Sequence, residues 1–240
     1  RLDAKNRYVL RMVASKELKG PVSQVTQLEG YIAISMGQKI QVYYLDWRSK
    51  QLIITSFYDI QFYVSSMISI KSFLLYSDIY RGAHFLRWRE KGHKLSLLAR
   101  DFKECHTVSS QFILNEDALG LVVTDMNKNI QVFSYAPMKD KKSLVPVADF
   151  HVGATVNSMA RLKSRDTQYD NDARKRGDFK TDVSRQFVLY STIEGGLGYI
   201  APIPEDMYRR LYVLTTKMYT QIEHSAGLHP KAYRLFKPVR

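Results

Sequence analysis

Val22-Ser23-Gln24 recurs along the chain as Val64-Ser65-Ser66, Val108-Ser109-Ser110 and Val156-Asn157-Ser158, at intervals of 42, 44 and 48 residues. An apolar run, a turn and a second apolar run follow each tripeptide. The second run reads Ile-Gln-Val and then an aromatic residue at both Ile40 and Ile130. Four strands every ~40–50 residues is the period of a β-propeller blade. The repeat therefore predicts an all-β fold, a partial β-propeller of about four four-stranded blades, with a helical C-terminal extension.

The predicted strands are short β-branched and aromatic runs bounded by Gly, Asn, Asp and Lys. They cover residues 31–35, 40–45 and 52–57 in the first unit, 72–76, 83–88 and 95–100 in the second, 119–124, 130–135 and 144–150 in the third, and 187–190 and 198–201 in the fourth. The fourth unit has no obvious last strand, and residues 8–14 read as a strand of an earlier unit. We therefore expect sequence outside this chain to complete the ring. The alternative is a β-sandwich whose spacing is accidental.

The chain departs from the repeat at two places. Residues 163–184 contain six basic and five acidic residues and almost no apolar ones, which predicts a mobile loop. From Pro204 the apolar period becomes helical, with two stripes that predict a wide buried face. These are Met207, Leu211, Leu214, Met218 and Ile222, and then Tyr208, Tyr212, Thr215 and Tyr219. Gly227 is the expected helix terminator, and a second helix is expected near residues 229–235. The predicted domains are residues 1–203, the propeller portion, and 204–240, the start of a helical domain.

Composition and charge limit the function. The chain has 240 residues, a net charge of +13 and one cysteine, Cys105, so it forms no internal disulfide. With no Asn-x-Ser/Thr site, this favours a reducing compartment, the cytosol or nucleus. Residues 1–20 contribute +4 and residues 207–240 contribute +6, a charge that attracts nucleic acid or acidic protein, or simply keeps the chain soluble. Because the chain starts at Arg1 without a signal peptide, we interpret it as a piece of a longer protein.

A search for catalytic, cofactor and metal sites gives no candidate. Gly195-Gly196-Leu197-Gly198 is followed by a predicted strand rather than a helix, so it predicts a hairpin turn and not a phosphate loop. Cys105 and His106 are adjacent, and adjacent strand residues face opposite sides, which disfavours a nucleophile–base pair. The six histidines lack metal-ligand spacing. Trp47 and Trp88 are either partner anchors or blade packing, and Arg209-Arg210 either binds an acidic group or is solvated.

Several stretches resemble one protein family. Asp149-Phe150-His151-Val152-Gly153 resembles the Asp-Phe-His-x-Gly stretch of large propeller scaffolds, which include the damaged-DNA-binding scaffold and the large propeller subunit of the spliceosomal U2 particle. The stretches 207–211 and 223–234, with Ala226-Gly227-Leu228-His229-Pro230-Lys231-Ala232 at the centre, are most similar to the large subunit of the cleavage and polyadenylation specificity factor. Residues 70–73 and 95–101 also fit that family. One departure is His229, where the family often has Asn.

The resemblance implies a non-catalytic, nuclear scaffold of the pre-mRNA 3′-end processing complex. Its partners would be WD-repeat and zinc-finger subunits, which recognise the polyadenylation signal, so pre-mRNA is reached mainly through them, and no membrane or cofactor is involved. Alternatives are a ubiquitin-ligase or spliceosomal scaffold, or a basic RNA-binding module. The candidate partner contacts are Arg209, Arg210, Tyr212, Tyr219, Glu223, His224, Leu228, Pro230 and Arg234.

Overall fold

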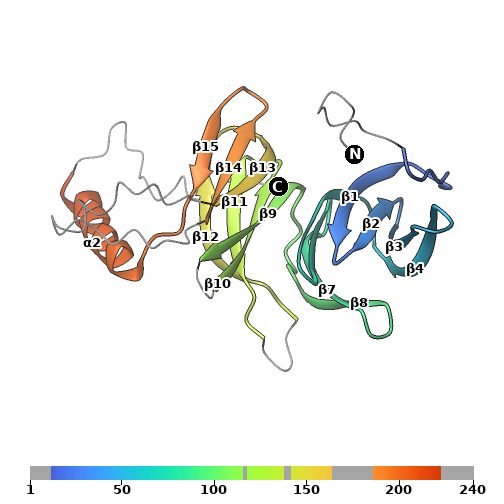
Figure 1. The fold of residues 1–240 in the computed structure, drawn as a ribbon. Coiled ribbons are helices and arrows are strands. Elements are labelled where there is room, and N and C mark those ends of the chain that lie inside the picture. The colour runs from blue at the N-terminus through green and yellow to red at the C-terminus, as the bar shows by residue number, and fades with distance from the viewer. Residues whose placement is uncertain (1–11, 116–117, 138–141, 164–185, 223–240) are drawn as a thin grey trace, which may run out of the picture.

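Four antiparallel sheets follow one another along the chain (Figure 1). The computed structural model describes residues 12–115, 118–137, 142–163 and 186–222. The first sheet contains β1 (Val22–Leu28), β2 (Tyr31–Met36), β3 (Lys39–Asp46) and β4 (Gln51–Asp59); the second contains β5 (Val64–Ile70), β6 (Phe73–Asp78), β7 (Gly82–Arg89) and β8 (Lys94–Arg100). The third contains β9 (Thr107–Asn115), β10 (Ala118–Asp125), β11 (Asn129–Ser134) and β12 (Val145–His151); the fourth contains β13 (Val156–Lys163), β14 (Gln186–Thr192) and β15 (Leu197–Ile200). The strands expected within the four units are thus confirmed, and the fourth sheet has three strands.

Each apolar core lies between two consecutive sheets. Leu74 and Trp88 of the second sheet pack against Ile40 and Val42 of the first. The opposite face of the second sheet packs on the third, and the third packs on the fourth, around Phe85 and Val122 respectively. Burial of one such side chain stabilises the fold by about 1.5–3 kcal/mol. Because the second and third sheets are covered on both faces, the structure is a partial propeller and not a two-layer sandwich.

The first strands β1, β5, β9 and β13 contact one another in that order, so they form the inner strands around the axis. Polar side chains in the repeated tripeptides, or directly after them, link these strands. Gln24 Nε2 donates to the Ser65 carbonyl at 2.9 Å, and the Ser110 hydroxyl and amide both donate to Ser66 Oγ at 3.1 and 3.2 Å. Gln111 Nε2 then donates to the Met159 carbonyl at 3.3 Å. The tripeptide repeat therefore marks the strands that join one blade to the next.

A β-bulge near the start of each inner strand corrects the sequence alignment of the third unit. The register skips one residue between Val22 and Gln24, between Val64 and Ser66, and between Val156 and Ser158. In the third unit Thr107 pairs with Asp125 and Ser109 with Thr124, so the skipped residue is Val108. Structurally, the third tripeptide therefore begins at Thr107, one residue before the position that sequence similarity suggested.

Helix α2 (Glu205–Gln221) follows the last sheet. Pro204, whose φ is −60° and ψ 151°, precedes the first turn, and Glu205 and Asp206 complement the positive helix end. None of its residues is buried; Leu214, for example, is 56% exposed. The expected wide buried face is therefore not formed among the described residues. A helix that exposes this much apolar surface gains little stability from packing. The domain boundary near residue 203 stays our proposal.

Several expectations concern residues outside the described parts of the chain: the insert from residue 164 onward, the helix end near Gly227 and the helix at 229–235. Of the strand expected at 8–14, only residues 12–14 are described, and these are not in a strand. Within the described ranges, no helix has the length and apolar character needed to cross a bilayer.

Candidate partner-binding rim

An exposed cluster of aromatic rings lies at one end of the first three sheets. Phe62 follows β4, Tyr80 lies in the β6–β7 turn, and His106 precedes β9. The Phe62 and Tyr80 ring centroids are 5.2 Å apart and edge-on, and Tyr80 meets His106 with the same spacing. Phe62 and Tyr80 are 42% and 50% exposed. We call this surface the aromatic rim, and we include in it Phe102 and the two arginines described next.

Two arginines flank these rings. The Arg81 guanidinium lies 5.9 Å from the centre of the Phe62 ring, and that of Arg100 lies 4.5 Å from the centre of Phe102, which is 62% exposed. Arg81 also pairs with Glu104, with 3.4 Å between Nη1 and Oε1. Aromatic and arginine side chains are the residues that most often dominate protein interfaces, since they bring large contact area with little loss of rotamer freedom. The rim therefore has the composition of a partner-binding surface.

The buried carboxylate of Asp78 fixes the backbone of this rim. Its Oδ1 accepts hydrogen bonds from the Tyr80 and Arg81 amides at 3.0 and 3.3 Å, and its Oδ2 accepts one from the Phe62 amide at 3.1 Å. The Asp78 carbonyl accepts a further bond from Thr107 Oγ1 at 2.7 Å. One side chain thus ties the loop after β4 to the β6–β7 turn, so the rings are held on a rigid support.

A polar cavity of about 290 Å³ opens beside the aromatic rim. It is lined by Gln61, Arg81, His84, Arg100, Asp101, Phe102, Lys103 and Glu104. Burial lowers the pKa of His84 and raises the pKa of Asp101. Both shifts favour the neutral forms of these two groups, and the cations Arg81, Arg100 and Lys103 line the same cavity together with the Glu104 carboxylate.

The chemistry of Cys105 argues against a nucleophilic role. Burial raises the pKa of its thiol to about 12, and the nearby Asp125 carboxylate, 3.9 Å from Sγ, adds to the effect. The thiol is therefore protonated at neutral pH, whereas nucleophilic cysteines are thiolates. Asp125 itself is occupied with the β10–β11 turn, where it accepts from the Asn129 amide at 2.8 Å and from Asn129 Nδ2 at 2.9 Å. In the described ranges no group of three or more His, Cys, Asp or Glu side chains could hold a metal ion.

The partner contacts expected from the sequence lie apart from the aromatic rim, on α2 or beyond it. Arg209 pairs with Glu205 at 2.5 Å, and Tyr212, 54% exposed, lies 6.1 Å from Tyr208 between ring centroids. Arg210 is exposed and Tyr219 half-buried. Glu223, His224, Leu228, Pro230 and Arg234 lie outside the described residues. In Figure 1, α2 lies beyond β12, on the side of the molecule away from the first sheet.

The two tryptophans differ. Trp88 is 1% exposed and packs on Tyr31 with centroids 5.1 Å apart, so it is a blade-packing residue. Trp47 is 68% exposed in the β3–β4 turn.

Sequence reasoning missed the aromatic rim because its rings come from separate loops. A signal was nevertheless present: an aromatic residue follows the fourth strand of two consecutive units, at Phe62 and Phe102.

Antiparallel blades joined at their inner strands define the class of the fold, a partial β-propeller. A model of the CPSF A subunit region matches residues 2–240, and the chain belongs to that family. It is 37% identical over 234 residues to the cleavage and polyadenylation specificity factor subunit 1 of Arabidopsis thaliana, covering 95% of this chain and 15% of that protein. The Drosophila melanogaster subunit 1 is 34% identical over 235 residues, with 96% and 16% covered. Protein cft1 of Schizosaccharomyces pombe is 28% identical over 237 residues, with 95% and 16% covered. The chain thus spans about one sixth of the length of these relatives.

Proposed function

We propose that this chain belongs to a non-catalytic, nuclear scaffold of the complex that cleaves and polyadenylates pre-mRNA. Two of the relatives above are named as subunits of a cleavage and polyadenylation specificity factor, which supports this role. In this proposal the aromatic rim and helix α2 hold other subunits, with WD-repeat and zinc-finger proteins as the expected partners.

The observation that carries the proposal is the contrast between polar groups inside the sheets and exposed rings outside them. The Asp78 and Asp125 carboxylates accept hydrogen bonds from backbone and neighbouring side chains of the blade turns. Phe62, Tyr80 and Phe102, by contrast, offer large apolar area to solvent. An arrangement that uses its carboxylates for structure and exposes rings beside arginines suits binding rather than bond cleavage.

The test is recovery of the complex from cells that express the tagged full-length protein. We expect Phe62→Ser with Tyr80→Ser to reduce recovery of at least one partner subunit roughly tenfold or more, because truncating an interface anchor costs 2 kcal/mol or more. Phe57→Ser on β4 is the control, because Phe57 is 59% exposed and lies outside the aromatic rim. Unchanged recovery for the rim variant, or equal losses for both variants, would contradict the proposal.

A further inference from the structure

The polar cavity beside the aromatic rim has two cations that form no ion pair among the described residues. Arg100 ends β8 and Lys103 lies in the loop after it. The third cation of the wall, Arg81, pairs with Glu104. Asp101 accepts a hydrogen bond at its Oδ1 from the Lys103 amide at 3.0 Å. The wall thus has three cations against the two carboxyl groups of Asp101 and Glu104, and its charge is positive.

The Arg100 guanidinium is oriented to receive a carboxylate. Its centre lies 4.5 Å from the centre of the exposed Phe102 ring, so one of its faces is covered. A stacked guanidinium keeps its N–H groups at its edge, where a carboxylate can accept two parallel hydrogen bonds. The Arg100 backbone is also fixed, because its amide donates to the Lys142 carbonyl at 2.9 Å and its carbonyl accepts from the Leu144 amide at 3.0 Å. An anion can therefore bind with little loss of side-chain freedom.

A glycine allows the β6–β7 turn to approach the loop that carries these cations. Gly82 has a φ of +76°, and a Cβ atom there would lie 3.3 Å from the Lys103 carbonyl oxygen. Next to this contact the Asp101 amide donates to the Ala83 carbonyl at 2.9 Å. Since Phe102 lines the cavity and also belongs to the aromatic rim, the exposed rings and the cations form one continuous surface.

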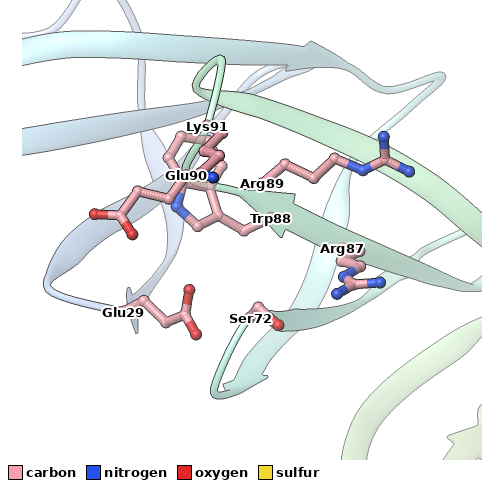
Figure 2. Close-up of a pocket in the computed structure, with 7 residues that line it drawn as sticks. All are labelled: Glu29, Ser72, Arg87, Trp88, Arg89, Glu90 and Lys91. Atoms are coloured by element: carbon pink, nitrogen blue, oxygen red, sulfur yellow. The ribbon is translucent and has the colours of Figure 1, made fainter.

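A larger cavity, of about 620 Å³, lies between the first two sheets at their opposite end (Figure 2). Figure 2 shows Arg87 and Arg89 extending to one side of it, while Glu29 and Glu90 lie on the other. The aromatic residue of its wall, Trp88, is 1% exposed, so it offers little ring surface to a ligand. At the aromatic rim, by contrast, cations and exposed rings share one wall.

We propose that the aromatic rim binds an extended segment of a partner subunit in which an acidic side chain lies close to an apolar one. The carboxylate of that segment binds Arg100 and Lys103 at the polar cavity, and the apolar side chain packs against Phe62 and Tyr80. This inference rests on the scaffold role proposed above and deepens it, because it defines the chemistry of the segment that the rim recognises.

Nucleic acid is another anion that could approach these cations, but the rings suit it less well. Bases stack on free ring faces. Guanidinium groups already lie over Phe62 and Phe102, 5.9 and 4.5 Å from the ring centres. Tyr80 meets Phe62 edge-on. The ring edges and the remaining apolar area suit aliphatic or aromatic side chains, so a peptide fits this surface better than a row of bases.

The first experiment joins neighbouring amines and carboxylates in the purified complex of the full-length protein. A carbodiimide activates a carboxyl group, takes up its oxygen as a urea, and leaves the carbonyl bonded to an amine in contact. We expect mass spectrometry to identify an amide between Lys103 Nζ and an Asp or Glu side chain of a partner subunit, with an apolar residue close to it in the partner sequence. If no partner carboxylate is coupled to Lys103, the inference is overturned.

The second experiment compares recovery of that subunit with variants of the tagged full-length protein from nuclease-treated extracts. For Arg100→Gln with Lys103→Gln we expect recovery to fall on the order of tenfold, because the partner carboxylate would lose its cations. Lys50→Gln with Lys71→Gln removes the same charge from exposed turns at the opposite end of the sheets and is the matched control. Equal losses in the two variants, or full recovery with the first, would overturn the inference. Release of the subunit by nuclease treatment alone would show contact through nucleic acid and would also overturn it.

Failure of this inference can be told apart from failure of the scaffold proposal. If Phe62→Ser with Tyr80→Ser lowers recovery while Arg100→Gln with Lys103→Gln does not, the rim binds a partner through its rings alone. The scaffold proposal then stands and the acidic segment is excluded. If neither variant lowers recovery, both proposals fail.

Discussion

At the scale of single residues, the buried carboxylates hold the loops in place by accepting hydrogen bonds from backbone amides. Asp78 is 1% exposed and accepts hydrogen bonds from three backbone amides in two separate loops. Sequence patterns did not single out this residue, since an acidic residue after an apolar run reads as an ordinary turn. Its role depends on the loop after β4, which only the packed blade brings beside it.

Asp78→Ala should lower the free energy of unfolding by about 3 kcal/mol, because it removes the acceptor of three part-buried hydrogen bonds from backbone amides. Asp59→Ala, which removes an exposed carboxylate paired with Lys39 at 3.9 Å, should cost less than about 1 kcal/mol. Urea unfolding followed by circular dichroism measures both variants. Similar losses of unfolding free energy in Asp78→Ala and Asp59→Ala would show that the β6–β7 turn does not depend on Asp78.

The raised pKa of Cys105 makes its thiol unreactive in the folded protein. At pH 8 a thiol with a pKa of about 12 is thiolate in roughly one molecule in ten thousand, whereas an unfolded cysteine near 8.5 is substantially ionised. Alkylation by iodoacetamide should therefore be at least about a hundredfold slower in the native protein than in urea, as mass spectrometry would measure. Since the folded state holds the proton more tightly, this residue's contribution to stability is lost as pH rises from about 9 towards 12. Equal native and unfolded rates would refute the assignment.

At the scale of elements, the sequence predicts where strands and helices lie more reliably than it predicts what packs against them. The run beginning at Ile40 alternates well enough to predict β3, and the helical period predicted α2. The period of an apolar stripe predicts a helix but does not identify the surface that packs against the stripe. On α2, Leu211, Leu214 and Met218 are all exposed. The third tripeptide was placed one residue late because an extra residue in a bulged strand leaves no local sequence signature.

Leu214→Asp on α2 should reduce recovery of partner subunits with the full-length protein, because a carboxylate cannot be buried in an apolar interface without a partner. The helix itself should persist, since Leu214 is exposed in it. Lys217→Asp introduces the same carboxylate on the same helix and should leave recovery unchanged. Quantitative mass spectrometry of the purified complexes measures the effect; full recovery with Leu214→Asp would exclude α2 as a contact surface.

At the scale of the whole molecule, stability declines from the axis outward. The inner strands β5 and β9 contact strands of neighbouring sheets, while six of the seven residues of β12 are exposed. The blade period predicted this arrangement, because it requires consecutive sheets to pack on each other. It did not predict the aromatic rim, since this surface gathers residues from turns of different blades.

Amide hydrogen exchange should therefore be slowest in β5, β6, β9 and β10 and fastest in β12 and β15. Exchange reports local opening, and opening of an outer strand exposes little apolar area. Mass spectrometry of exchange over minutes to hours would resolve the order. Protection in β12 equal to that in β9 would contradict an outward decline of stability.

The bulge at the start of each inner strand also bears on how the chain tolerates changes in length. Removing one residue elsewhere in a strand inverts every later side chain, so apolar groups turn to solvent. Removing Val108 would eliminate a residue that the ladder already skips, and the pairings on either side would be kept. Each blade therefore contains one position where its length can change by a residue while the core stays in register.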